Sequence, residues 1–412
     1  MAAKNYAVCS IIPPHMLAGI VQSTSAQQIS RDCAQHTLDH TDEIRVQRHP
    51  SLRQTQHGPP GAQGIVPPHI TSHVAQHHDD QGVRASADDT TKHDEGIRAA
   101  RAKGDHSAVS AGAINRKIYS CNGTTRLPGT LIRGEGQQPI GTRDASRDPD
   151  ECYEGFGATF DFYKNILGRN SINDRGLPLI GSVHYGRKYD NAMWDGEQMI
   201  FGDGDGVIFN GFTDELDVIG HELTHGVTQY TANLEYEGES GALNESISDC
   251  FGSMIKQYSL KQDSATADWL IGEGLLAKGI NGVALRSMKA PGTAYDDPQL
   301  GGKDPQPSNY ANLYKGTQDN GGVHINSGIP NKAFYLACIG LGGNSWDRCG
   351  KIWYETLTSG KLSTRANFQA FADLTASVAS TLYDADASQA VVDAWAGVGI
   401  TVTGGQSGGG GL

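Results

Sequence analysis

Aromatic residues are almost confined to the part of the chain after residue 118, and this distribution limits where a hydrophobic core can form. The 412 residues include 10 Phe, 5 Trp and 15 Tyr, yet only Tyr6 precedes Tyr119. A stretch of that length without aromatic side chains cannot readily bury enough apolar surface to offset its chain entropy. We therefore expect residues 106–412 to be globular and residues 1–105 to be an appendage.

The appendage contains one apolar piece. Residues 9–21 are apolar and contain a Pro-Pro turn, so we expect residues from about 6 to 50 to dock on another surface. The rest, up to residue 105, is polar and rich in histidine. These histidines keep no ligand-like spacing, which favours a tether over a metal-binding tract.

The globular part changes character near residue 216. Residues 117–133 and 178–212 are rich in Gly, Tyr, Ile and Val with frequent turn signals, which predicts strands and hairpins, including a hairpin at 203–206. Helical patterns dominate afterwards, up to a Gly-rich tail. We therefore expect an α+β chain with a β-rich domain over 106–216 and an α-helical domain over 217–412.

Composition excludes several classes of protein. The net charge of -13 argues against a nucleic-acid binder, which needs clustered cations. No apolar run of membrane-spanning length is present. Pro13 and Pro14 interrupt the only apolar stretch near the start, so no signal peptide is recognised and we expect a cytoplasmic protein or one secreted by a leaderless route. None of the 7 cysteines forms a CxxC pair, and a bridge between Cys338 and Cys349 is not expected.

The strongest chemical signal lies on a predicted helix over 214–230, with Thr213 as a candidate N-cap. Its apolar stripe has helical period and consists of Leu216, Ile219, Leu223, Val227 and Tyr230. His221 and His225 are four residues apart and project from one side, so both can bind one zinc ion. Glu222 lies beside them and can act as a general base.

A second predicted helix supplies a third ligand. Its stripe is Leu243, Ile247, Phe251 and Met254. Glu245 completes a His2Glu set that leaves the fourth position open for water, and Asp249, one turn later, can accept the remaining N–H of a ligating imidazole. A solvated acidic face would explain each acid separately, but it fits poorly with the Asn244-Glu245 pair beside Gly and Ala.

Several motifs occur together and in a recognisable order. They are Asn191-Ala-Met-Trp-Asp-Gly196, Gly202-Asp-Gly-Asp-Gly206, His221-Glu-Leu-Thr-His225, Gly241-Ala-Leu-Asn-Glu-Ser-Ile-Ser-Asp249, Leu285-Arg-Ser-Met288 and Asp319-Asn-Gly-Gly-Val-His-Ile-Asn-Ser-Gly328. With this set the chain resembles the thermolysin-like family of zinc metallopeptidases from about residue 117 to 399. The resemblance implies a two-domain fold with the zinc cleft between the domains.

The resemblance also implies roles for single residues. It makes the chain an endopeptidase in which Glu222 assists attack by a zinc-bound water, while His324, oriented by Asp319, and Tyr236 stabilise the oxyanion. Asn244 and Asp249 are expected to support the ligands. Substrate backbone would be bound by Asn191, Ala192 and Arg286. The implied pocket is apolar and favours a large apolar residue just after the scissile bond; its walls are Phe209, Phe212, Val218, Ile271 and Leu285.

The N-terminal segment resembles the short propeptide of the protealysin-like branch of that family. The matching motif is Pro13-Pro14-His15-Met16-Leu17. The resemblance implies a propeptide that blocks the cleft of its own chain and a precursor that processes itself, with a cut expected between about 95 and 112. The expected partners are peptide or protein substrates and the propeptide, and the expected state is a monomer.

Calcium is expected at one site or none. Asp217, Asp268 and Glu273 match a calcium-binding cluster of the family, but Lys256 and Leu270 stand where that pattern has acids. Calcium takes six to eight oxygen ligands. An ammonium group among the remaining acids can replace the ion with a salt bridge.

Other readings remain open at this point. A zinc exopeptidase would need a group that captures a free substrate terminus, and no motif for one is present. A catalytically idle zinc-binding protein of the same fold has no need of Glu222, Tyr236 and His324. A third alternative is a permanently latent precursor whose propeptide acts as an inhibitor, which the sequence does not exclude.

Overall fold

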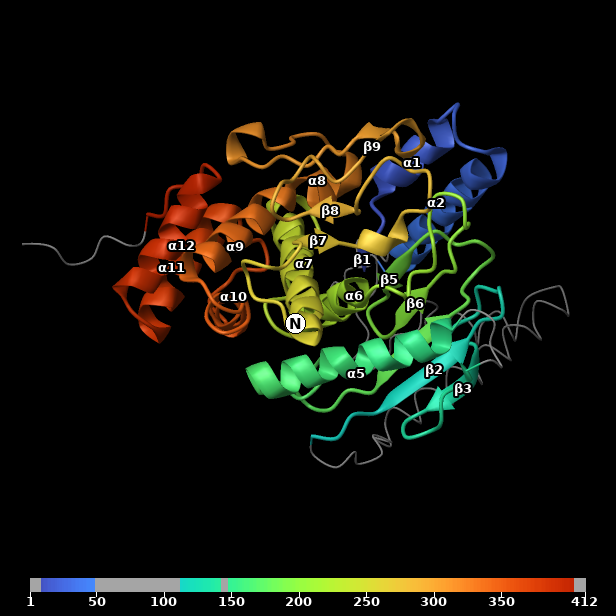
Figure 1. Cartoon of the computed structure of the whole chain (residues 1–412), viewed down its shortest axis with the longest axis horizontal. Helices are drawn as coiled ribbons and strands as arrows, with labels where there is room; N and C mark the ends of the chain where they lie inside the picture. Colours follow the sequence, from blue (N-terminus) through green and yellow to red (C-terminus); the bar gives the residue numbers. More distant parts are fainter. Residues whose placement is uncertain (1–8, 49–111, 142–146, 404–412) are drawn as a thin grey trace, which may run out of the picture. The chain divides into compact units, whose positions relative to one another are not determined.

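A six-stranded sheet organises the first half of the globular part (Figure 1). The structure is a computed structural model that describes residues 9–48, 112–141 and 147–403. Strand order is β1-β5-β6-β4-β2-β3, with parallel pairing of β2 with β4 and of β4 with β6, and antiparallel pairing elsewhere. The strands are β1 Cys9–Ser10, β2 Arg116–Ser120, β3 Thr130–Gly134, β4 Leu179–Val183, β5 Ala192–Trp194 and β6 Met199–Phe201.

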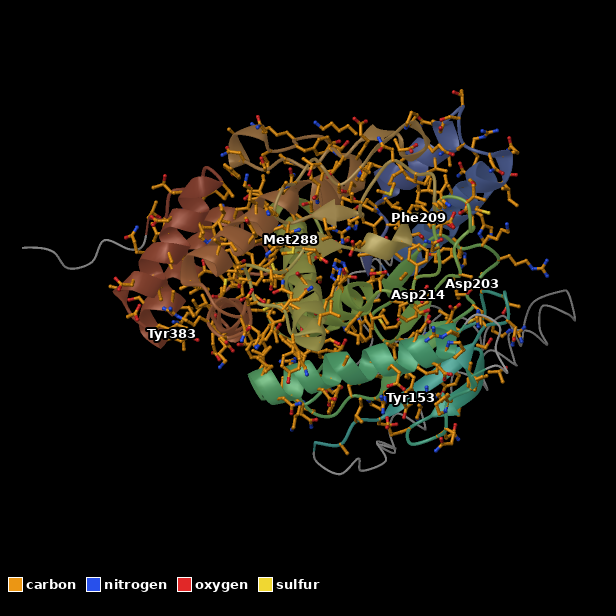
Figure 2. All side chains as sticks on the ribbon, viewed as in Figure 1. Tyr153, Asp203, Phe209, Asp214, Met288 and Tyr383 are labelled. Atoms are coloured by element: carbon orange, nitrogen blue, oxygen red, sulfur yellow. The ribbon has the colours of Figure 1, made fainter. Side chains whose placement is uncertain are left out.

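One helix within the predicted β-rich domain was not anticipated. Helix α5 (Asp148–Leu167) packs against the sheet, where Gly181 of β4 leaves room for Cys152 and Phe156. Tyr153, labelled in Figure 2, contacts the guanidinium groups of Arg116 and Arg133 at 3.6 and 3.5 Å from its ring centroid. Cation–π contacts of this kind hold α5 to β2 and β3.

Two helices cross at the centre of the chain. Helix α6 (Leu216–Gln229) begins later than predicted, because Thr213 does not cap it and instead donates its hydroxyl proton to Asp148 and Glu151. Tyr230 lies beyond its end and is exposed, so it does not belong to the buried stripe. Helix α7 (Gly238–Leu260) buries the predicted stripe on one face.

The rest of the globular part is mainly helical, and its last four helices gather at the opposite end from the N-terminal segment (Figure 1). This arrangement confirms the predicted α+β fold. Its helices are α8 Gln318–Asn326, α9 Gly328–Leu341, α10 Cys349–Thr358, α11 Phe368–Leu382 and α12 Ala385–Gly397; the short elements before them are β7 Leu270–Ile271, η3 Glu273–Leu275, β8 Arg286–Ser287, β9 Asp296–Asp297, η4 Pro298–Leu300, β10 Gly302–Lys303 and η5 Tyr310–Asn312. Cys338 and Cys349 are buried free thiols.

The N-terminal segment is ordered as a strand and two helices. After β1 come α1 (Pro14–Gln22) and α2 (Gln28–Arg48). Helix α1 buries Met16, Leu17 and Ile20, and its Gly19 packs directly on Gly301. Helix α2 instead buries small and polar side chains: Ser30, Cys33, Ala34, Thr37 and Thr41. The His-rich tether, residues 49–111, lies outside the described residues.

The predicted hairpin at residues 203–206 is wrong. This segment is a loop between β6 and α6. The Asp205 carboxylate accepts hydrogen bonds from the backbone N–H groups of Val207, Ile208 and Phe209 at 2.8, 2.8 and 3.1 Å, which replaces strand pairing with a turn. Among the described residues, no helix is long and apolar enough to cross a membrane.

Candidate active site

The close packing of α6 on α7 brings the predicted metal ligands together. A Cβ added at Gly252 of α7 would lie 2.4 Å from the carbonyl oxygen of Asp217 and 3.1 Å from the backbone nitrogen of His221, both on α6. Glycine is required here because the two backbones approach so closely. As a result, Glu245 of α7 faces His221 and His225 of α6.

These three residues form a compact, buried group. The Nε2 atoms of His221 and His225 are 3.0 Å apart, and each lies 3.5 Å from a carboxylate oxygen of Glu245. The Oε2 atom of Glu245 is buried and has no hydrogen-bond partner among the described residues. A buried anionic oxygen is costly unless a cation pairs with it. Two imidazole nitrogens and a carboxylate are also the donor set of catalytic zinc sites, so the residues fit that ion.

The outer edges of both imidazoles are held in place. His221 Nδ1 lies 2.8 Å from Asp249 Oδ1, and His225 Nδ1 lies 2.9 Å from Asn244 Oδ1. Donation through Nδ1 leaves each Nε2 lone pair directed at the centre of the group. Ser248 Oγ also lies 3.0 Å from His225 Nδ1. Sequence reasoning missed Ser248, although its position one turn after Asn244 was available as a signal.

Asp249 links the metal group to Arg286. Its carboxylate accepts hydrogen bonds from Arg286 Nε at 2.8 Å and Nη2 at 2.7 Å, and from Asn331 Nδ2 at 2.8 Å. Burial favours the neutral acid, but Arg286 and His221 outweigh it and hold the pKa of Asp249 below its usual range. Asn331 was also missed, and no local pattern marks it because the contact spans 82 positions.

Glu222 lies beside the metal group in a fully buried position. The backbone N–H of Trp194 donates to its Oε2 at 2.9 Å, while Oε1 has no partner among the described residues. Burial, and then the charge of Glu245, raise the pKa of Glu222 well above its usual value. A carboxylate in this environment accepts a proton readily.

His324, Asp319 and Tyr236 meet on the other side of the group. His324 Nδ1 lies 2.6 Å from Asp319 Oδ1, and its Nε2 lies 3.2 Å from Tyr236 Oη. Tyr236 also donates to Glu245. Although burial opposes it, the charges of Glu245 and Asp319 raise the pKa of His324.

A left-handed turn within α8 produces this geometry. Residues 319–322 all have positive φ, including 55° at Asp319 and 49° at Asn320. The turn lets the Asp319 carboxylate reach the backbone N–H of His324, 2.8 Å away, as well as its ring. Gln306, which was not predicted, donates to the carbonyl of His324 at 2.7 Å and fixes it from behind.

The predicted substrate-binding residues contact the backbone of the N-terminal segment. Ile11 N–H donates to Ala192 O at 3.0 Å, and Ile12 N–H donates to Asn191 Oδ1 at 2.8 Å. Arg286 Nη1 donates to Ile11 O at 3.1 Å. The segment therefore lies along the cleft as an extended peptide, continuing the antiparallel pairing of β1 with β5.

The five predicted pocket residues are all buried. Phe209, whose position Figure 2 marks, Phe212, Val218, Ile271 and Leu285 belong to one hydrophobic cluster with Ile11. Both ring nitrogens of His15 are buried without a partner among the described residues. Burial lowers the pKa of His15 to about 4, although Asp319 opposes the shift, so this imidazole is neutral.

The predicted calcium cluster already contains a cation of the protein. Lys256 Nζ lies 3.4 Å from Asp217, 3.1 Å from Asp268 and 3.7 Å from Glu273. Burial disfavours the ammonium, but Asp217 and Asp268 outweigh it and raise the pKa of Lys256. The lysine thus places one positive charge among these three carboxylates.

Comparisons with known proteins agree with this geometry. Residues 86–229 match the family described as thermolysin metallopeptidase, catalytic domain; residues 232–400 match its alpha-helical domain; and residues 9–52 match the protealysin propeptide. The chain is 44% identical over 399 residues to an extracellular metalloprotease of Pectobacterium carotovorum subsp. carotovorum, covering 97% of this chain and 98% of the relative.

Two further proteins extend the comparison. Protease PrtS of Photorhabdus sp. (strain Az29) is 52% identical over 296 residues, covering 71% of this chain and 78% of the relative. The solved precursor of protealysin, a metalloproteinase from Serratia proteamaculans, superposes with a TM-score of 0.75 at 44% identity. That comparison covers 95% of this chain and 100% of the solved chain.

Proposed function

Because the chain belongs to the thermolysin-like family and is a zinc metalloendopeptidase with an N-terminal propeptide, we propose that His221, His225 and Glu245 hold the catalytic zinc ion and that Glu222 is the general base. The paired Nε2 atoms and the partnerless Glu245 Oε2 support the ligand set. Asp249 and Asn244 orient the two imidazoles.

The protein's own groups then divide the work of peptide hydrolysis. A bound zinc ion supplies Lewis acidity at the substrate carbonyl and increases the acidity of water. Glu222 Oε1, which has no other partner among the described residues, accepts the proton of the attacking water and returns a proton to the leaving nitrogen. His324 Nε2 and Tyr236 Oη donate to the carbonyl oxygen as negative charge develops on it, and Asp319 keeps His324 in position.

Substrate binding follows the contacts made by the N-terminal segment. Asn191, Ala192 and Arg286 bind backbone groups of the substrate, and the five apolar wall residues receive the side chain that follows the scissile bond. This pocket favours cleavage on the N-terminal side of large apolar residues. The observation that carries the proposal is that an extended peptide already occupies the backbone-binding groups of Asn191, Ala192 and Arg286.

The same contacts make the propeptide an intramolecular inhibitor. Residues 9–17 cover the cleft with the motif Pro13-Pro14-His15-Met16-Leu17, so peptide substrates cannot enter while it is docked. We place the propeptide at residues 1–105, the β-rich catalytic domain at 106–216 and the helical domain at 217–412. Activation would be self-processing between about 95 and 112.

Three further points complete the proposal. Asp217, Asp268 and Glu273 need no calcium, since Lys256 pairs with all three. One chain carries both cleft and inhibitor, which supports a monomer as the working form. The Pectobacterium relative is named extracellular, which supports a site of action outside the cell.

The test compares wild type with Glu222→Gln. Processed wild type is expected to cleave an internally quenched peptide with Leu after the scissile bond and to lose this activity to a zinc chelator. Glu222→Gln cannot process itself, so its propeptide is removed with an added protease; it should then bind zinc normally yet lose roughly 10²–10⁴-fold in rate, the range for a general base. A peptide with Asp at the same position is the specificity control. If wild type binds zinc but cleaves no peptide, the idle or latent reading replaces this one.

A further inference from the structure

We propose that the propeptide is bound as a substrate, with the Ser10–Ile11 peptide bond presented for hydrolysis, so that the precursor cuts its own inhibitor inside the cleft. This inference rests on the proposed function. It names a specific substrate bond of the same site and a step separate from the cut expected in the tether.

The register of the bound segment identifies the bond. His324 Nε2 lies 2.8 Å from the carbonyl oxygen of Ser10. On the other side of the same peptide unit, the N–H of Ile11 donates to Ala192 O at 3.0 Å. His324 is the proposed donor to the carbonyl under attack, so the carbonyl it contacts belongs to the scissile bond.

The following residues fix the direction of the chain. The next carbonyl, that of Ile11, accepts from Arg286 at 3.1 Å, and the next N–H, that of Ile12, donates to Asn191 at 2.8 Å. Four consecutive backbone groups thus meet four groups of the cleft. Such alignment holds the carbonyl in one orientation, which is what hydrolysis requires of a bound substrate.

The side chain after this bond matches the proposed specificity. Ile11 is an apolar residue that is fully buried, and it belongs with the predicted pocket walls to the main hydrophobic core. Ile29, by contrast, lies on α2 with 42% of its surface exposed and touches none of the cleft groups in the contacts above. Ile11 and Ile29, two isoleucines of the same propeptide, therefore form a matched pair, one presented to the site and one not.

Hydrolysis of the Ser10–Ile11 bond needs no reactant other than water. Water adds across the amide, the C–N bond breaks, and Ser10 leaves with a carboxylate while Ile11 keeps a free ammonium group. The fragment that begins at Ile11 stays anchored, because Ile12, Met16 and Leu17 are buried beneath it and α2 follows. The nicked precursor therefore remains inhibited, and the short fragment 1–10 is released.

The experiment follows new N-termini in the full-length wild-type chain by terminal labelling and mass spectrometry. A terminus at Ile11 and a free fragment 1–10 are expected with first-order kinetics, and the half-time should be unchanged over a 100-fold range of protein concentration. A cut within one molecule has no dependence on concentration. Absence of the Ile11 terminus while the tether is processed, or a rate proportional to concentration, would overturn the inference.

Matched variants test whether the cut depends on the docking of Ile11 in the cleft or only on the presence of an isoleucine after the cleaved bond. Ile11→Asp should abolish the terminus at residue 11, whereas Ile29→Asp should leave its rate unchanged. The aspartate of Ile11→Asp could also prevent docking of the segment. Ile11→Leu keeps an apolar side chain at this position, so this variant should still be cut at the same bond. Equal cutting before Ile29 would show that the propeptide is digested only after release. If neither precursor nor processed chain cleaves the quenched peptide, the proposed function itself fails.

Discussion

Two acidic clusters include residues of helices α6 and α7, and the partners of their carboxylates differ. Asp217 precedes His221 by one helical turn, and Lys256 follows Glu245 by about three turns. In the first cluster Lys256 pairs with Asp217, Asp268 and Glu273. In the second, Glu245 Oε2 has no hydrogen-bond partner among the described residues, and the Glu245 carboxylate faces the imidazole nitrogens of His221, His225 and His324. The first cluster therefore contains a permanent ammonium group, whereas the second presents imidazole nitrogens and a carboxylate that can share an exchangeable metal ion.

Glu245→Gln gives the largest expected effect. The amide lacks the charge that pairs with zinc, so bound zinc should fall below one per chain and peptide hydrolysis should fall by more than about 100-fold, the upper range for changes outside the ligand shell. Elemental analysis and the quenched-peptide assay measure both. Glu237→Gln, exposed at the start of the same helix, is the control. A Glu245→Gln chain that retained stoichiometric zinc would contradict the ligand assignment.

Lys256→Ala tests the other cluster. It leaves Asp217 fully buried without its ammonium partner, which should lower the free energy of unfolding by about 3–4 kcal/mol. Urea unfolding of the uncut Glu222→Gln precursor avoids self-digestion. Lys278→Ala, at an exposed site nearby, should change little. An unchanged stability in Lys256→Ala would mean that Asp217 is neutral and that the cluster needs no cation.

Glu215→Gln is expected to change how the free energy of unfolding depends on pH. Burial and the charge of Asp217 raise the pKa of Glu215 to about 7, despite the opposing ammonium of Lys256. The pKa of this acid is higher in the folded chain than in the unfolded chain. Its contribution to stability is therefore present below the pKa of the unfolded chain, and it is lost as the pH rises through the pKa of the folded chain. Glu215→Gln should therefore match wild type near pH 4 and exceed it by about 2–3 kcal/mol at pH 8. Equal pH profiles in urea unfolding would show that Glu215 is solvated.

Calcium gives the smallest expected effect. Millimolar calcium, or a calcium-selective chelator, should leave the Tm of the wild-type chain within about 1 °C, because Lys256 already neutralises the acids. Lys256→Glu should acquire a calcium-dependent Tm, since it restores an oxygen ligand in place of the ammonium. A large calcium response in the wild type would place the ion elsewhere in the chain.

Local spacing explains why the metal group could be predicted from sequence. His221, Glu222 and His225 are positioned by the helical repeat alone, and Glu245 by a second stripe of the same period. Asn331 and Gln306 reach the site through contacts with residues that are distant in the sequence. Such contacts leave no periodic pattern in the sequence. For these residues only the packed structure provides the signal.

The errors in the fold have physical causes as well. Helix α2 buries serine, threonine and cysteine, so it lacks the apolar stripe by which helices are predicted. The loop at 203–206 carries a hairpin sequence, but the Asp205 carboxylate takes the backbone N–H groups that strand pairing would use. The roles of the substrate-binding residues came from family resemblance rather than from spacing.

The joining of cleft and inhibitor in one chain has a consequence for stoichiometry. An inhibitor on the same polypeptide is present at a fixed local concentration, in the millimolar range for short flexible connections, however dilute the protein becomes. Dilution therefore cannot dissociate the inhibitor from the cleft. Each molecule contains one inhibitory segment for its one active site. Under the proposed self-processing, the onset of proteolysis would depend on covalent cleavage of the chain and not on its dilution.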